Sequence, residues 1–138
     1  MNDYFGDAGY WIALSDTDDA FHQQATEYNT LLELEGARII TTQLVLNELL
    51  NPRSGTTRRQ RQAAIDLVDQ IRRNPLVTIE PQSSEQFDES LERLRRRVDQ
   101  EWSITDCASF LAMERYGITA ALTGDHHFTQ AGFFAMLR

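Results

Sequence analysis

The chain has 138 residues, of which 41% are hydrophobic and 25% are charged, and this composition predicts one globular domain over residues 1–138. A net charge of −8 argues against non-specific binding of nucleic acid by the whole surface, and the single cysteine, Cys107, suits a reducing, cytoplasmic setting. The apolar runs are too short to span a bilayer, so we expect no membrane partner.

The first half of the chain alternates apolar, strand-like runs with helical patterns. A short strand is predicted to end near Asp7, which is the one charge among the apolar residues around it. Aspartates after Ser15 favour a helix start, and this helix is predicted to run from Ser15 to Leu34. A buried strand at 37–41 and a helix at 43–50 follow.

The second half continues the alternation, with two helices that open on a serine and a capping residue three positions later. The predicted elements are a helix at 57–73, a strand at 77–80, a helix from Ser83 to Val98, a helix from Ser103 to Gly117, a strand at 120–123 and a short final strand within 126–137. This order predicts an α/β fold with three α/β/α layers around a short, mainly parallel sheet.

Four acidic residues stand next to these predicted strands. Asp7 and Asp125 follow strand-like runs, while Glu48 and Asp106 lie on helices beside strands. Ligands of parallel sheets bind beyond the carboxyl ends of the strands, so all four acids are candidates for one site there. Each also has an ordinary interpretation: a turn aspartate for Asp7 and Asp125, a solvated helix residue for Glu48, and a helix cap for Asp106.

The repulsion between converging carboxylates must be compensated, because two like charges about 4 Å apart repel by roughly 4 kcal/mol at an effective dielectric constant of about 20. A hard divalent cation relieves this repulsion, and an all-oxygen ligand set favours Mg²⁺ or Mn²⁺ over Zn²⁺. Such an ion can activate water for phosphodiester hydrolysis.

The thirteen basic residues are all arginines, so a P-loop or a Schiff-base lysine is excluded.

Four motifs in order carry a resemblance to a known family. They are Asp7-Ala8-Gly9-Tyr10-Trp11, Leu46-Asn47-Glu48-Leu49-Leu50, Trp102-Ser103-Ile104-Thr105-Asp106 and Thr123-Gly124-Asp125-His126-His127-Phe128. Together with the closing Gln130-Ala131-Gly132-Phe133, they resemble a PIN domain of the VapC toxin ribonuclease type. The resemblance runs from about Phe5 to the C-terminus.

The resemblance implies a PIN-type fold and a metal site made by Asp7, Glu48, Asp106 and Asp125. It also implies Mg²⁺- or Mn²⁺-dependent cleavage of RNA that leaves a 5′-phosphate, a cognate antitoxin that blocks the site, and a homodimer. The arginines near the start of the predicted helix at 57–73 are candidates for contacts with RNA phosphates: Arg53, Arg58, Arg59 and Arg61.

One position departs from the family pattern. Members commonly carry Ser or Thr directly after the first aspartate, and this chain has Ala8. The departure leaves open a PIN-like module that binds RNA or protein without cutting it. A metal-dependent phosphatase for small phosphate esters is a third, weaker interpretation.

Other reactive side chains have simpler interpretations. Cys107 fits core packing better than a nucleophile, since the sequence offers it no partner base. His126 and His127 are adjacent, and we expect exposed turn residues or caps there rather than metal ligands.

Overall fold

Five strands in the described part of the chain form one parallel sheet in the order β3-β2-β1-β4-β5. A computed structural model describes residues 2–51 and 56–138. The strands are β1 (Asp3–Gly6), β2 (Arg38–Thr42), β3 (Val77–Glu80), β4 (Ala120–Leu122) and β5 (Phe134–Ala135). The helices are α1 (Ala8–Ser15), α2 (His22–Glu35), α3 (Gln43–Leu50), α4 (Arg58–Arg73), α5 (Ser84–Arg96), α6 (Ile104–Tyr116) and α7 (His126–Gln130).

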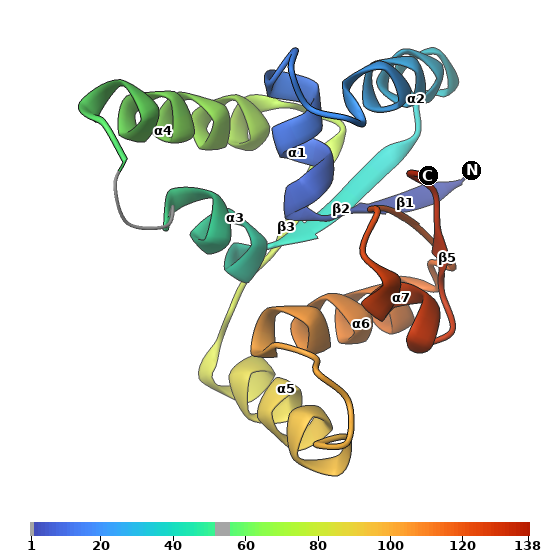
Figure 1. Cartoon of the computed structure of the whole chain (residues 1–138). Helices are drawn as coiled ribbons and strands as arrows, with labels where there is room; N and C mark the ends of the chain where they lie inside the picture. The colour runs from blue at the N-terminus through green and yellow to red at the C-terminus, as the bar shows by residue number, and fades with distance from the viewer. Residues whose placement is uncertain (1, 52–55) are drawn as a thin grey trace.

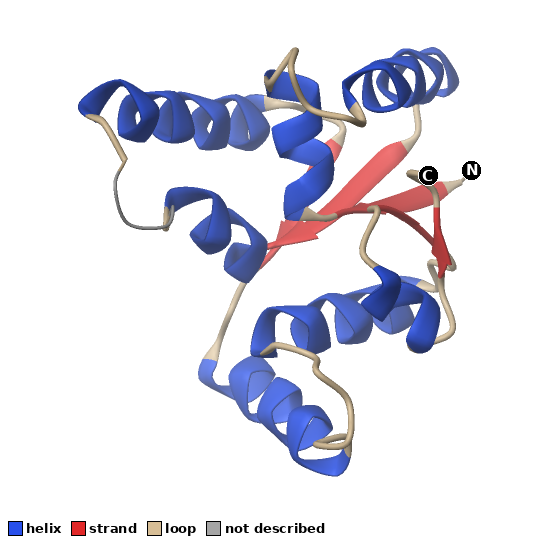
Figure 2. Cartoon of the chain, in the orientation of Figure 1, coloured by secondary structure: helices blue, strands red, loops and turns tan. Residues whose placement is uncertain are grey.

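Helices cover both faces of this sheet. Figure 1 shows α1, α2 and α4 on one side and α5, α6 and α7 on the other, with the sheet between them in Figure 2. The helix α6 packs on β1 and β2, and α5 packs on α6. The three-layer α/β/α fold with a parallel sheet is therefore confirmed. No helix in the described part of the chain is long and apolar enough to cross a membrane.

The helix α6 is the most deeply buried helix, and its ends follow from its sequence. Ser103 and Asp106 form the predicted capping box, each side chain accepting a hydrogen bond from the other's backbone N–H. Gly117 ends the helix in the left-handed conformation, which a residue without Cβ adopts at little cost. Between these ends, the Phe110 ring packs edge-on against Trp102 and Phe128, which ties α6 to the loop before it and to α7.

The predicted helix from Ser15 to Leu34 is wrong at its start. The chain forms α1 up to Ser15, then turns, and α2 begins only at His22. The turn is held by two aspartate side chains, since Asp16 accepts from the N–H of Asp18 and Asp19 accepts from the N–H of Phe21. The aspartates that favoured a helix start instead bond the backbone two residues ahead, which is the competing use of this side chain.

Further differences concern the end of one helix and the presence of helices that were not predicted. The fifth helix stops at Arg96 rather than Val98, and Val98 is 83% exposed. The chain turns at Arg97, whose guanidinium lies over the Trp102 ring 5.1 Å from its centroid. The final strand is present as β5, but the helix α1 and the short helix α7 that precedes β5 were not predicted.

Candidate active site

Four acidic side chains lie at the edge of the sheet where its parallel strands end. Asp7 follows β1, Glu48 lies on the helix after β2, Asp106 lies in the first turn of α6, and Asp125 follows β4 and caps α7. Figure 1 shows α1 and α3 on one side of this edge and α6 and α7 on the other. The charges of Glu48 and Asp106 act on Asp7, and those of Asp106 and Asp125 act on Glu48.

Asp7 has the most strongly perturbed carboxyl group of the four. Burial raises its pKa from 3.8 to about 7, and the charges of Glu48 and Asp106 add to this increase. Hydrogen bonds from the Ala8 backbone and the Thr123 hydroxyl oppose it by stabilising the carboxylate. The Thr123 Oγ1 donates to Asp7 Oδ2 over 2.9 Å and accepts the N–H of Asp125 over 3.1 Å, so one buried hydroxyl joins two of the acids.

Asp106 uses one carboxylate oxygen for two contacts. Its Oδ2 accepts the Ser103 N–H over 3.1 Å and lies 2.9 Å from Nδ1 of His127. The first contact is half of the capping box. The second joins α6 to α7, two elements that are 21 residues apart at this point of the chain.

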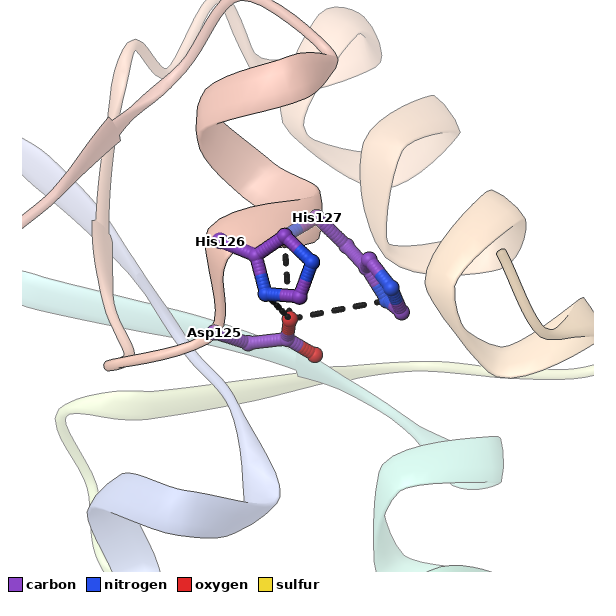
Figure 3. A group of neighbouring side chains, drawn as sticks. All are labelled: Asp125, His126 and His127. Atoms are coloured by element: carbon purple, nitrogen blue, oxygen red, sulfur yellow. Dashed lines mark hydrogen bonds and ion pairs between the residues drawn. The ribbon is translucent and has the colours of Figure 1, made fainter. Parts of the chain in front are cut away.

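Asp125 begins α7 and lies between two imidazoles. Its Oδ1 accepts the backbone N–H of His127 over 2.9 Å, which is the expected bond of an aspartate cap. Figure 3 shows both rings beside this carboxylate, with Nδ1 of His127 at 3.5 Å and Nδ1 of His126 at 3.7 Å from Oδ1. One candidate ligand atom from each of the three residues lies within 4.8 Å of the others, whereas no three of the four acids form such a group within the described residues.

Glu48 faces the other acids from an exposed position on α3. Partial burial raises the pKa of its carboxyl group, the neighbouring Thr105 hydroxyl lowers it, and the charges of Asp106 and Asp125 raise it further. The leucines on either side do not bury Glu48 in the core. It borders the edge of the sheet from the solvent side.

Comparison with known proteins agrees with this geometry. The PIN domain family matches residues 4–134, which is nearly the whole chain. The chain belongs to the PIN domain family. The 23S rRNA-specific endonuclease VapC20 of two Mycobacterium tuberculosis strains is 32% identical to this PIN domain over 132 residues, covering 94% of both chains. The crystal structure of VapC20 from M. tuberculosis, described as a sarcin-ricin loop cleaving toxin, matches it with a TM-score of 0.78 at 29% identity, covering 98% of this chain and 99% of the other. The resemblance to the VapC type is thereby confirmed.

The acids of this PIN domain fit a hard divalent cation by their chemistry. They offer carboxylate oxygens from four different elements, and burial, together with the charges of the neighbouring acids, raises the pKa values of Asp7 and Glu48. A cation among them would relieve that repulsion, and all-oxygen donors suit Mg²⁺ or Mn²⁺.

Two residues of the site were missed by sequence reasoning. Thr123 links Asp7 to Asp125, and its position two residues before Asp125 is a signal that could have indicated a hydroxyl bonding the turn. His127 was expected to be an exposed turn residue or cap, and this prediction is wrong, because its ring is half-buried against Asp106. The sequence held no signal for this contact, since it depends on how α7 packs beside α6.

The remaining candidates lie apart from the acids. Arg58, Arg59 and Arg61 are exposed at the start of α4, where Arg61 Nη1 donates to the Thr56 carbonyl over 2.8 Å. Arg53 lies outside the described residues. Cys107 is buried in the core, and burial raises the pKa of its thiol to about 11, which argues against a thiolate nucleophile.

Proposed function

We propose that this PIN domain, over residues 1–138, is a metal-dependent endoribonuclease of the VapC type and the toxin of a toxin–antitoxin pair. The observation that supports this most directly is the meeting of four acidic side chains from four elements at the carboxyl edge of a parallel sheet. The family match over residues 4–134 agrees with it.

The proposed roles follow from the chemistry of the donors. Asp7, Asp106 and Asp125 would hold Mg²⁺ or Mn²⁺, directly or through water, and Glu48 would complete the site or orient a water molecule. The bound cation would supply charge neutralisation at the phosphodiester and a more acidic water. Thr123 and Ser103 keep Asp7 and Asp106 in fixed orientations through the hydrogen bonds described above. By the family resemblance, cleavage leaves a 5′-phosphate product.

The substrate we propose is ribosomal RNA. The relative that matches along nearly its full length is described as specific for 23S rRNA, and its crystal structure as that of a sarcin-ricin loop cleaving toxin. We extend this target to the present chain, together with a cognate antitoxin, a homodimeric state and action in the cytoplasm, where ribosomes are found.

The test is cleavage of 23S rRNA, and of a sarcin-ricin loop oligonucleotide, by protein freed of any co-purified antitoxin. We expect discrete products with Mg²⁺ or Mn²⁺, none with chelator, and a loss of at least 100-fold in rate for Asp106→Asn. Asp88→Asn on the exposed face of α5 removes an equal charge and is expected to cleave normally. Cleavage that persists in chelator or in Asp106→Asn would contradict the proposal.

A binding module without activity is the second candidate, and Ala8 is the observation that favours it. This residue removes the hydroxyl that the family commonly places after the first aspartate. The Thr123 hydroxyl already donates to Asp7 from β4's end, which weakens this alternative. Asp125→Asn separates the two: the nuclease loses cleavage, whereas a binding module retains its affinity for RNA and never cleaves.

A further inference from the structure

We propose that His127 is a positioning residue, which orients the Asp106 carboxylate toward the metal without itself binding the ion. The inference rests on the proposed function, because it names how one acid of that same site is held. It begins from the contrast between two adjacent imidazoles. The side chain of His127 is 18% exposed and contacts Asp106, whereas that of His126 is 75% exposed.

The hydrogen bonds of Asp106 fall on one side of its carboxylate. Oδ2 receives both the Ser103 N–H and Nδ1 of His127, at 3.1 and 2.9 Å. Among the described residues, no hydrogen bond reaches Oδ1. The two donors therefore fix the plane of the carboxylate and leave Oδ1, with all of its lone pairs, for a cation or its water.

His127 holds a second acid by its backbone. Its N–H donates to Asp125 Oδ1 over 2.9 Å, while its ring reaches Asp106. The residue therefore fixes two carboxylates that come from different elements, α6 and the end of β4. These two contacts hold α7 beside the start of α6.

The tautomer argues that His127 acts through Asp106 and not as a ligand at Nδ1. We assign the proton to Nδ1 of His127, because a carboxylate only accepts hydrogen bonds and Asp106 Oδ2 lies 2.9 Å away. A nitrogen that donates this proton has no lone pair for a metal. Metal binding through Nε2 is the alternative that the experiment must separate from positioning.

Three substitutions make that separation. The amide nitrogen of His127→Asn lies near the position of Nδ1 and can replace its hydrogen bond, whereas His127→Gln places its amide near Nε2. His127→Ala removes both nitrogens. All three leave the backbone N–H that Asp125 accepts. Thr129→Ala is the control, because Thr129 is an exposed residue of the same helix, α7, and its side chain forms no hydrogen bond within the described residues.

Two readouts are needed: the single-turnover rate of RNA cleavage, and Mn²⁺ affinity by calorimetry, which does not depend on activity. We expect His127→Ala and His127→Gln to lower both by about 10- to 100-fold, as is usual for residues that orient metal ligands. We expect His127→Asn to lie within about 3-fold of the wild type, and Thr129→Ala to be unchanged. Melting temperatures check that each variant is folded.

Several outcomes would overturn the proposal. Full activity in His127→Ala removes any role for the ring. A loss in His127→Asn as large as in His127→Ala, or a restoration by His127→Gln, points to Nε2 as a ligand or proton carrier. If His127→Ala does not fold, the comparison of the Asn and Gln variants decides. If the wild type cleaves no RNA, the proposed function fails, while the Mn²⁺ titrations still test His127.

Discussion

The carboxyl group of Asp7 is buried among other acids, and the protonation of this group is therefore linked to the stability of the fold. Its pKa rises from 3.8 to about 7 on folding, so the folded protein binds this proton more tightly than the unfolded chain. Between about pH 4 and pH 7 the folded state holds more protons, and the stability contributed by the protonated group falls as pH rises. Above pH 7 the buried charge costs on the order of 4 kcal/mol.

We expect Asp7→Asn to remove this dependence. In chelator at about pH 7.5, the variant should have a higher free energy of unfolding than the wild type, by up to the order of 4 kcal/mol, and the two should converge near pH 4. Urea unfolding at several pH values measures this, with the exposed Asp88→Asn on α5 as control. Added Mg²⁺ should stabilise the wild type more than the variant. A variant that is less stable at pH 7.5 would mean that Asp7 serves mainly as a turn residue, bonded to Ala8 and Thr123.

At the scale of elements, the passage from β1 into α1 sets where Asp7 lies. Gly6 ends β1 beneath the Trp11 indole, and a Cβ there would come within 2.9 Å of Trp11 Cζ2 and 3.0 Å of Ile39 Cγ2. Gly9 lies in α1 with no atom within 4 Å of the position of a Cβ. The two glycines flank Asp7, but only the first is required by packing.

Alanine at each glycine tests this difference. Gly6→Ala must displace a buried indole, and we expect it to destabilise the protein by about 1–3 kcal/mol and to weaken Mn²⁺ binding, since it precedes Asp7 directly. Gly9→Ala relieves the entropic cost of glycine within a helix, and we expect a gain of about 0.5–1 kcal/mol. Both changes in stability are measured as shifts of the urea unfolding midpoint, with the slope of the unfolding free energy against urea concentration unchanged. Equal effects of the two substitutions would show that the contact with Trp11 does not determine how much a side chain at position 6 destabilises the protein.

The elements also show what the sequence could predict. Local patterns were sufficient for the five strands, the α6 capping box and the edge of the sheet at which the four acids lie; the roles of these acids stay predictions. Local patterns failed where one residue type has two uses, as with Asp16 and Asp19, which bond a turn instead of starting a helix. They also failed for His127, whose partner Asp106 is fixed by tertiary packing.

At the scale of the whole molecule, the proposed function requires a protein with a negative net charge to bind RNA, which is also negatively charged. With a net charge of −8, the average surface repels RNA, so binding has to come from a local group of arginines. On α5, Arg95 and Arg96 pair with Glu92, at 2.6 and 3.2 Å. At the exposed start of α4, Arg58 and Arg59 form no ion pair within the described residues, and positive charge there opposes the helix dipole. These two guanidinium groups are therefore the better candidates for phosphate contacts.

Paired substitutions on the two helices separate a specific contact from a change in net charge. We expect Arg58→Gln with Arg59→Gln to weaken RNA binding at least tenfold and to lower the slope of log affinity against log salt by about 1.4, which is roughly 0.7 for each phosphate contact with single-stranded RNA. Arg95→Gln with Arg96→Gln removes the same charge from residues already paired with Glu92, and should change both quantities much less. Fluorescence anisotropy in an Asp106→Asn background measures affinity without cleavage. If the two double variants lose affinity equally, RNA affinity depends only on the net charge of the protein, and the start of α4 makes no specific contact with RNA.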